Sequence, residues 1–365
     1  MSRLPGLDLL RALAVIWVML FHTFLVGGLG EDFNWLSRFG WAGVDMFFVL
    51  SGFLIGCQWL TPLAQGQAPS FTAFYARRAW RVLPAFLVVL AVYVAAPTWR
   101  EAPGMQPWWQ FATFTVNLLI DYGSNQAFSH AWSLCVEEHF YLVFPMLALA
   151  LSRGATLGRT LSVCIALVLA GIALRTGIWL RDDAADPARA WFVEDLYYPT
   201  WTRLDGLLAG VGLALVKVWR PTWWAALLKR GSQILLLGLA LVAAALCLFR
   251  DRTGLAANSV GWPLLSMGMA ALVVAGASPR SWIGRWPLPG IGWIATISYT
   301  LYLSHKLVMH AVAQALPPSF TGVPRFCVFA LAILAVGAAL HFLVERPGLQ
   351  WRDRQGRRGR GWIPA

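Results

Sequence analysis

An arginine and a histidine interrupt the first strongly apolar stretch of the chain, LLRALAVIWVMLFHTFLV (residues 9–26). On a helix, Asp8, Arg11 and His22 fall on one face, and Arg11 lies roughly 16 Å from His22 along the axis. Ionisable groups are costly inside a membrane and indicate function there. A neutral imidazole can act as a general base near pH 7, so His22 is a candidate catalytic residue. The structural alternative is that Arg11 reaches the membrane surface and His22 only bonds a neighbouring helix.

Polar residues also occur in four later apolar stretches, which contain the segments GWAGVDMFFVLSGFLI, HAWSLCVEEHFYLVFP, WTRLDG and ISYTLYLSHKLVMH. The polar or chemically useful residues in them are Asp45, Trp132, Ser133, Glu137, Glu138, Tyr141, Arg203, Asp205, Ser298, Tyr302 and His305. Residues spaced by three or four share a helix face, as in the sets Ser133/Glu137/Tyr141 and Ser298/Tyr302/His305. If the bundle brings these faces together, they enclose a polar cavity in the outer half of the membrane.

These residue types suggest how an imidazole would work there. A carboxylate can orient a catalytic imidazole, and Asp45, Glu137 and Glu138 are equivalent candidates for that role. Arg203, Tyr302 and Ser133 are candidate hydrogen-bond donors to an oxyanion. Trp132, Glu138 and His305 are further candidates for contact with the substrate or the oxyanion. Neither His-x-x-x-His nor His-Glu-x-x-His spacing occurs, so we expect no catalytic metal.

A cluster of arginines marks the segment FYARRAWRVLP, which we place just before the third apolar helix. Arg77 and Arg81 are four residues apart, and Arg78 lies between them. The cluster is either a charge signal that orients the helix or a clamp for a phosphorylated cytosolic ligand, because guanidinium groups match phosphate bidentately. A basic site on one side and an imidazole site toward the other imply a long ligand or transport.

The composition defines the elements that must position these residues. The chain has 365 residues, of which 58% are hydrophobic and 13% are charged, against about 25% charged in soluble domains. Apolar runs of about 20 residues recur and are continuous rather than alternating, which favours membrane helices over a barrel. We therefore predict an all-α polytopic membrane protein with one ten-helix bundle in residues 1–346 and a basic cytoplasmic tail in 347–365. The helices are predicted near 7–28, 39–60, 82–97, 131–151, 159–180, 200–219, 232–249, 260–277, 291–316 and 323–344.

The distribution of charge predicts the orientation. The net charge is +12, and with a cytoplasmic N-terminus most Lys and Arg residues fall on the cytoplasmic side, as the positive-inside rule requires. The charges assigned to the two sides include Arg3, Arg153 and the tail Arg346 to Arg360 inside, and Glu31, Asp32, Asp183 and Asp186 outside. The basic charge is thus a topology signal rather than a sign of nucleic-acid binding. The tail is expected to contact anionic lipid headgroups.

Three smaller features complete the prediction. Cys57, Cys135, Cys164, Cys247 and Cys327 lie in apolar segments without metal or redox spacing, so we expect small buried hydrophobic residues. Residues 108–120 are too short to span comfortably and suggest an interfacial or re-entrant element. The glycines of GLLAGVG (206–212) favour close helix packing.

Six segments in order resemble the acyltransferase-three family of integral membrane O-acyltransferases. GLDLLRALAVIWVMLFHTF is similar to its first-helix signature, GVDMFFVLSGFLIG to its second-helix signature, and RRAWR to its arginine motif. AWSLCVEEHFYLVFP is similar to its Trp-Ser-Leu-x-x-Glu-Glu-x-Phe-Tyr element, and SYTLYLSH and VERP resemble its last two helices. The chain departs from the pattern at His139, where a Gln is frequent.

The resemblance implies a ten-helix enzyme of a bacterial inner membrane. It implies transfer of an acyl group, acetyl in many members, from cytosolic acyl-CoA to a hydroxyl of an extracytoplasmic glycan or lipid-linked sugar. Arg11, Arg77, Arg78 and Arg81 would hold the CoA phosphates, and the pantetheine arm would extend through the bundle toward His22. Membrane lipids and the glycan acceptor are the implied partners.

Several alternatives remain open from the sequence. His22 either deprotonates an attacking hydroxyl or is itself acylated. A proton-coupled transporter of a glycan or lipid precursor would use the intramembrane His, Asp and Glu residues as a proton relay, and a non-catalytic export partner could share the bundle. The acceptor, the acyl group and the oligomeric state are not specified.

Overall fold

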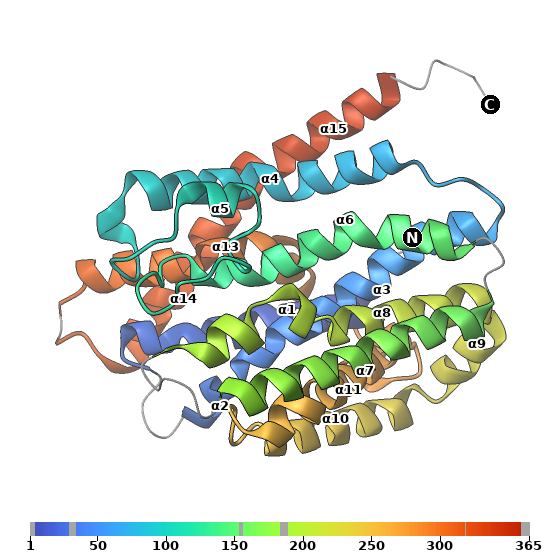
Figure 1. Ribbon diagram of the computed structural model, residues 1–365. Coiled ribbons are helices and arrows are strands. Elements are labelled where there is room, and N and C mark those ends of the chain that lie inside the picture. The colour runs from blue at the N-terminus through green and yellow to red at the C-terminus, as the bar shows by residue number, and fades with distance from the viewer. Residues whose placement is uncertain (1–3, 29–33, 153–155, 183–188, 318, 359–365) are drawn as a thin grey trace.

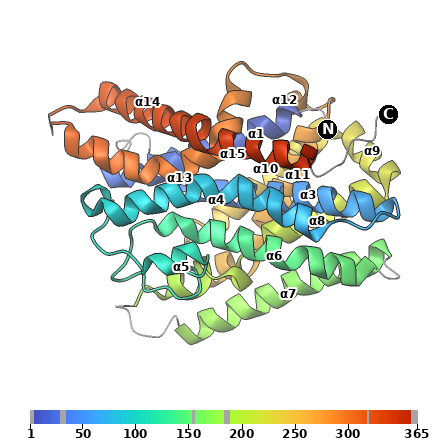
Figure 2. The same ribbon diagram turned by 90° about the horizontal axis from the view of Figure 1, so that it is seen from above.

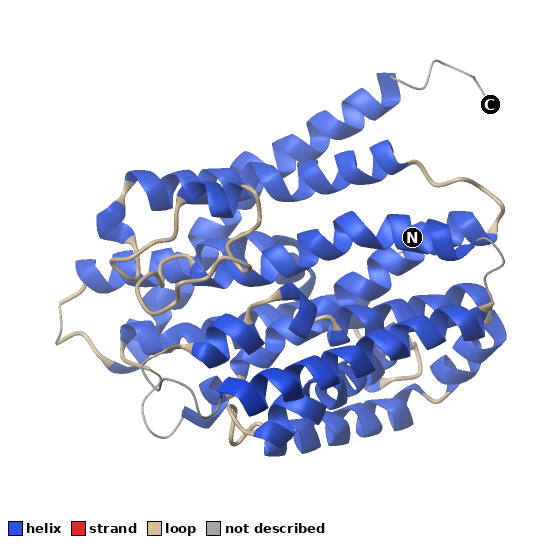
Figure 3. Cartoon of the chain, in the orientation of Figure 1, coloured by secondary structure: helices blue, strands red, loops and turns tan. Residues whose placement is uncertain are grey.

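Long helices make up the architecture. The computed structural model describes residues 4–28, 34–152, 156–182, 189–317 and 319–358, and these residues contain helices and loops but no strand (Figure 3). Arg3, Glu31, Asp32, Arg153, Asp183, Asp186 and Arg360, which entered the charge analysis, lie outside these ranges.

Each of the ten predicted helices corresponds to a long helix in the described part of the chain. They are α1 (Pro5–Phe21), α3 (Gly43–Ala64), α4 (Phe71–Ala95), α6 (Trp132–Ser152), α7 (Leu157–Asp182), α8 (Asp205–Trp219), α10 (Gly231–Leu248), α11 (Trp262–Ala277), α13 (Ile291–Ala315) and α14 (Gly322–Leu340). Shorter helices are α2 (Asn34–Arg38), α5 (Trp108–Ala112), α9 (Pro221–Lys229), α12 (Trp282–Arg285) and α15 (Arg346–Arg358). Among the described residues, eight helical segments are long and apolar enough to cross a membrane. The chain is therefore an all-α, multi-pass membrane protein.

The long helices run side by side in one bundle (Figure 1). Seen from above, α7 lies along one flank and α14 along the other (Figure 2). The α3–α4 and α8–α9 connections lie at one end of the bundle, while the α4–α6 loops and the α13–α14 connection lie at the opposite end (Figure 1). α15 continues the chain beyond α14 and contacts α4 through a Trp80–Trp351 pair with ring centroids 4.5 Å apart.

Three helix boundaries differ from the predicted ones. α4 begins at Phe71 rather than near 82, because Ser70 caps it through the amide of Ala73 at 3.2 Å and Phe71 packs on Trp59. The arginine cluster therefore lies inside α4 and not before it. α1 ends at Phe21, and residues 22–26 continue as a 3₁₀ turn that ends at Gly27 with φ +94°. The helix predicted at 200–219 begins at Asp205, after a 3₁₀ turn at Thr200–Thr202.

Glycines bring α8 against α3, as the GLLAGVG pattern predicted for two of its three positions. A methyl group added at Gly210 would overlap backbone atoms of Val49 and Phe53, and one added at Gly206 would press on the Cβ of Phe48. Gly212 is different, since the nearest atom to such a methyl group is 3.9 Å away on Leu161. Small residues in membrane helices permit this close backbone approach.

Two minor predictions can be compared with the structure. Residues 108–120 form no long helix: the short α5 carries the exposed Trp108 and Trp109 and is followed by turns. Cys57 and Cys135 are buried as expected and Cys164 is half-buried, whereas Cys247 and Cys327 are exposed on α10 and α14. The prediction of five buried cysteines was therefore wrong for those two, because a membrane helix presents apolar residues to lipid as well as to its neighbours.

Candidate active site

A cavity of about 240 Å³ with a mixed polar and apolar lining lies between α1, α3, α4, α6 and α13. Its polar and tyrosine lining comprises Arg11, Ser51, Arg78, Arg81, Ser133, Glu137, Glu138, Tyr141, Ser298, Tyr299 and Tyr302. On α6, Ser133 and Tyr141 are eight residues apart, so the lining extends over about 12 Å of that helix. The predicted polar face of α6 and the Ser298 and Tyr302 positions of α13 therefore line one cavity with Arg11. His22, His305, Asp45, Arg203 and Asp205 are not part of its lining.

Three of the four predicted phosphate-binding arginines line this cavity, and each already has a neighbour. Arg11 lies 4.0 Å from Asp8, and the guanidinium carbon of Arg78 lies 4.4 Å from the centroid of the Tyr141 ring. Arg81 forms an ion pair with the fully buried Glu345. Arg77 is exposed and is not part of the lining. The cavity therefore has a cationic region formed by α1 and α4.

The carboxylates predicted as possible partners of His22 lie elsewhere. Glu137 accepts hydrogen bonds from Ser51 at 3.1 Å and from Tyr141 at 2.6 Å. Glu138 lines the same cavity. Both carboxylates thus face the cavity, and the structure does not bring them to His22.

Asp45 is also occupied by another partner. Its Oδ1 accepts a hydrogen bond from Arg203 at 2.8 Å, and both side chains are buried. The Arg203 guanidinium is covered by aromatic rings, with its carbon 3.7 Å from the Trp262 ring centroid and 5.2 Å from that of Trp132. Trp132 stacks on Tyr198 at 5.0 Å. Arg203 and Trp132 thus belong to an aromatic cluster beside the cavity rather than to its lining.

Hydroxyl groups mark the end of the cavity away from the arginines. The Ser133 hydroxyl lies 2.6 Å from the Tyr302 hydroxyl, and Tyr302 donates to the backbone carbonyl of His130 at 2.9 Å. Tyr302 also accepts on its own carbonyl a hydrogen bond from Nδ1 of His305 at 2.8 Å. This wall of the cavity is therefore bonded directly to the next group of residues, which contains His22.

Three imidazoles meet beyond Tyr302. The ring centroids of His22 and His305 are 4.9 Å apart, those of His130 and His305 5.0 Å, and those of His22 and His130 6.3 Å. His305 is 0% exposed and His130 2% exposed, whereas His22 remains half-buried. Within the described ranges, no three His, Cys, Asp or Glu side chains are grouped so that they could hold a metal ion. His22 thus contacts two other imidazoles of the protein.

A buried ion pair supports the turn that carries His130. Lys306, next to His305 on α13, lies 2.8 Å from Glu101 and donates to Ser129 at 2.9 Å. Glu101 also accepts from the amide of Phe128 at 3.0 Å, and Phe128 has the unusual φ of +56°. Burial opposes ionisation of Glu101, but the Lys306 charge and the hydrogen bonds outweigh it and hold the pKa of this carboxyl below its ordinary value.

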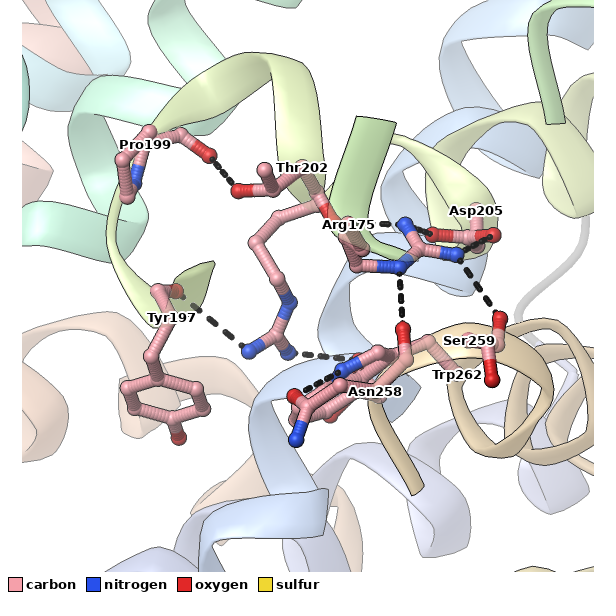
Figure 4. A network of polar contacts seen from close by, with 10 residues as sticks. Arg175, Tyr197, Pro199, Thr202, Asp205, Asn258, Ser259 and Trp262 are labelled. Atoms are coloured by element: carbon pink, nitrogen blue, oxygen red, sulfur yellow. Dashed lines mark hydrogen bonds and ion pairs between the residues drawn. The ribbon is translucent and has the colours of Figure 1, made fainter. Parts of the chain in front are cut away.

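A second buried ion pair joins three helical segments behind the aromatic cluster. Arg175 of α7 forms two hydrogen bonds to Asp205 of α8, at 2.8 and 3.1 Å, and a third to the carbonyl of Asn258 at 2.7 Å. Figure 4 shows the guanidinium directed at Asp205, with Asn258 and Ser259 beside it. Arg175 is completely buried. Asp205, one of the polar residues noted in the WTRLDG segment, is therefore the partner of Arg175.

Sequence reasoning missed several members of these groups. Arg175 carried a usable signal, because an arginine within an apolar helix needs a partner. His130 and Glu101 carried little, since both lie outside long helices and their direction cannot be calculated from helical spacing. Glu345 lies within the family-like segment VERP, but its pairing with Arg81 joins residues 264 positions apart.

Comparison with known proteins identifies a family. The family model described as "Acyltransferase domain", which is that of the acyltransferase-three family, matches residues 4–342. The chain is 27% identical over 369 residues to "Peptidoglycan O-acetyltransferase OatA" of Listeria monocytogenes, covering 94% of this chain and 55% of that protein. It is 30% identical over 370 residues to "Putative peptidoglycan O-acetyltransferase YrhL" of Bacillus subtilis, covering 94% of this chain and 54% of that protein.

These matches cover nearly all of this chain but only part of each relative. The chain spans about half the length of these curated relatives. No solved structure matches the chain significantly. The similarity thus covers the membrane bundle described above.

Proposed function

This chain belongs to the acyltransferase-three family, and we propose that it transfers an acyl group, most simply acetyl, from cytosolic acyl-CoA across the membrane to a hydroxyl group of an extracytoplasmic glycan. The two curated relatives described above carry names that refer to O-acetylation of peptidoglycan, which supports a cell-envelope glycan as the acceptor. The proposed location is the bacterial inner membrane with both chain ends in the cytoplasm, which agrees with the excess of basic residues assigned to that side.

This proposal rests on one observation: a single cavity has arginines at one end and the hydroxyl groups of Ser133 and Tyr302 at the other. Arg11, Arg78 and Arg81 supply cationic groups suited to phosphate, and guanidinium forks bind phosphate well. About 240 Å³ is less than the roughly 300–1,000 Å³ that encloses a drug-sized ligand. The cavity therefore suits a slender part of the donor, such as the pantetheine arm, with the bulky charged end outside.

The reacting end would be built from the hydroxyl wall and the imidazoles. His22 would remove the proton of the acceptor hydroxyl as it attacks the thioester. Ser133 and Tyr302 line the cavity and are the proposed donors to the oxyanion. To donate to it, their hydroxyl hydrogens would turn from Tyr302 and the His130 carbonyl, which accept them in the resting structure, toward the acyl group. Arg203, which is held by Asp45 and enclosed by rings, would instead support the aromatic cluster around Trp132.

The test uses purified protein in proteoliposomes with radiolabelled acetyl-CoA and soluble glycan fragments. We expect the substitution His22→Gln to reduce transfer by about 10²- to 10⁴-fold, the range typical of a lost general base. Arg78→Gln is expected to raise the KM for acetyl-CoA by at least about tenfold, because a charge-assisted hydrogen bond contributes about 1.5–3 kcal/mol. Arg159→Gln is the matched control, since Arg159 is exposed at the start of α7.

Three results would contradict the proposal. The first is wild-type transfer by the His22→Gln protein. The second is equal effects of Arg78→Gln and Arg159→Gln, which would leave only a topological role for Arg78. The third is uptake of labelled glycan into vesicles without any acyl donor, which would indicate the transporter alternative.

A further inference from the structure

Hydrogen bonds determine where the protons of the imidazole group lie. Nδ1 of His305 is 2.8 Å from the carbonyl oxygen of Tyr302. A carbonyl oxygen can only accept, so Nδ1 of His305 carries the hydrogen. In neutral His305 the other nitrogen, Nε2, is then an acceptor.

The same reasoning applies to His22. Its Nδ1 lies 3.0 Å from the carbonyl oxygen of Val18 and 3.0 Å from Nε2 of His305. Both neighbours are acceptors, so Nδ1 of His22 must be the donor. Nε2 of His22 then has a free lone pair, and it makes no hydrogen bond within the described part of the chain. The Val18 carbonyl also accepts the backbone N–H of His22, which caps the end of α1, so the same oxygen fixes both the backbone and the ring of this residue.

His130 cannot take the place of His305. Its Nε2 lies 3.2 Å from the carbonyl of Leu303, so this nitrogen is the donor and Nδ1 is the acceptor. Nδ1 of His130 is buried without a partner among the described residues. Of the three rings, only His22 and His305 form a hydrogen bond between imidazoles. His130 packs against both and restricts their rotation.

We propose that His305 is the positioning residue for His22, in place of the carboxylate expected from sequence, and that it holds His22 with Nδ1 protonated and Nε2 as the base. This proposal rests on the proposed function. The acceptor O–H bond breaks and its proton moves to Nε2 of His22, while the acceptor oxygen bonds to the acyl carbon and the C–S bond breaks. The thiolate that leaves takes the proton from Nε2 and departs as the free thiol. Throughout, Nε2 of His305 accepts the hydrogen of Nδ1, as a carboxylate does in a Ser-His-Asp triad.

A neutral partner suits this environment. A carboxylate beside His22 would require a second charge to be removed from water, at a cost of several kcal/mol. An imidazole with its Nδ1–H fixed by a backbone carbonyl supplies a lone pair without a net charge. The nearest buried charges, Lys306 and Glu101, already neutralise each other.

The first experiment measures the tautomer directly and does not depend on activity. The full-length protein is labelled with ¹⁵N-histidine, reconstituted in lipid bilayers and studied by solid-state NMR. The chain has only six histidines, so His22→Gln assigns the His22 signals by difference. We expect Nδ1 of His22 to be protonated and Nε2 unprotonated. A protonated Nε2 in the resting protein would overturn the inference, even if acyl transfer is demonstrated.

The second experiment separates positioning from packing. His305→Gln keeps a side-chain oxygen that can accept from His22, whereas His305→Leu removes it. We expect the Leu variant to lose at least about 100-fold in kcat, within the range for impaired general-base catalysis, while the KM for acetyl-CoA changes little because the arginines are untouched. The Gln variant should recover at least about fivefold over Leu, which is the factor that corresponds to a hydrogen bond of about 1 kcal/mol.

His310→Gln is the matched control, because His310 lies five residues further along α13 and bonds only to Gln314 among the described contacts. We expect wild-type kcat for it. Equal losses for His305→Gln and His305→Leu would overturn the positioning role, and so would wild-type kcat in the Leu variant. If no glycan accepts acyl groups from the wild-type protein while the tautomer is as expected, the proposed function fails and the assignment of protons stands.

Discussion

At the scale of single residues, this protein places several of its buried charges in pairs. Glu101 and Lys306, Asp45 and Arg203, and Asp205 and Arg175 each lie 2.8 Å apart with little or no exposure. Removing one partner of such a pair leaves an uncompensated charge, which is strongly destabilising. The pairs therefore constrain which substitutions the site tolerates.

Glu101 gives a pH-dependent prediction. We expect Glu101→Gln to lower the free energy of unfolding by about 3–5 kcal/mol at pH 7, because Lys306 is left buried without its partner. The folded-state pKa of Glu101 lies below the ordinary value, so the carboxylate stabilises the fold fully above about pH 4.3, the unfolded value. That contribution is lost as the pH falls through the folded-state pKa. The difference in the free energy of unfolding between wild type and variant should therefore shrink below about pH 4.3.

Thermal unfolding in detergent between pH 3 and 8 measures this difference. Glu194→Gln is the comparison, because its ion-pair partner Arg189 is 46% exposed and exposed pairs contribute about 1 kcal/mol or less. The Gln oxygen can still accept the Tyr122 amide hydrogen that Glu194 accepts. A Glu101→Gln effect that is no larger, or that does not change with pH, would contradict the assignment of a stabilising buried pair.

At the scale of helices, α3 and α8 are held at a distance that only glycine permits. Gly210 faces backbone atoms of α3, whereas Gly212 faces open space near Leu161. The same stretch of α8 thus contains a test position and its own control.

We expect Gly210→Val to reduce the thermal unfolding midpoint by at least several degrees, because added atoms would push α8 away from α3. Gly212→Ala should remain within about 0.5 kcal/mol of wild type, as is usual for substitutions away from such contacts. Fluorescence-detected size exclusion after stepwise heating compares the two proteins. If the Gly210→Val protein is as stable as Gly212→Ala, the close approach of the two helices is not required.

The positions of the long helices are the part of the structure that the sequence predicted correctly. Apolar length placed all ten long helices, and helical spacing brought Ser133 and Tyr302 to one cavity. Spacing could not show that α4 starts eleven residues early, because its first turns carry three arginines and lack the apolar signal. It also could not choose the partner of His22 among Asp45, Glu137 and Glu138, and it did not consider His305, which lies 3.0 Å from His22 in the structure. The choice depends on how helices rotate against one another, which is set by contacts distant in sequence.

At the scale of the whole molecule, the two ends of the bundle differ in their chemistry. The end with the α3–α4 connection has the arginine cluster of α4 and the basic α15, and the opposite end has the loops that carry Glu101 and His130. A transferase built in this way would take its donor from one side only.

Membrane vesicles of defined orientation test this prediction. Inside-out vesicles, which expose the cytoplasmic face, should acylate their glycan when acetyl-CoA is added outside, because the donor cannot cross the membrane. Right-side-out vesicles should give no more signal than vesicles that contain the His22→Gln protein. Equal transfer in both preparations would contradict the sidedness of the donor site.

α1 has a further consequence for donor choice. It is a continuous helix from Pro5 to Phe21, and its rise of about 1.5 Å per residue leaves little freedom to stretch or shorten. Under the proposed function, α1 fixes the distance between Arg11 and His22. A thioester donor with a shortened arm could then reach either Arg11 or His22, but not both at once. Truncated donors should then lose turnover and not only affinity, since remote binding energy no longer assists the reacting bond. The selection of donors by the length of their arm would then follow from the fixed backbone of α1.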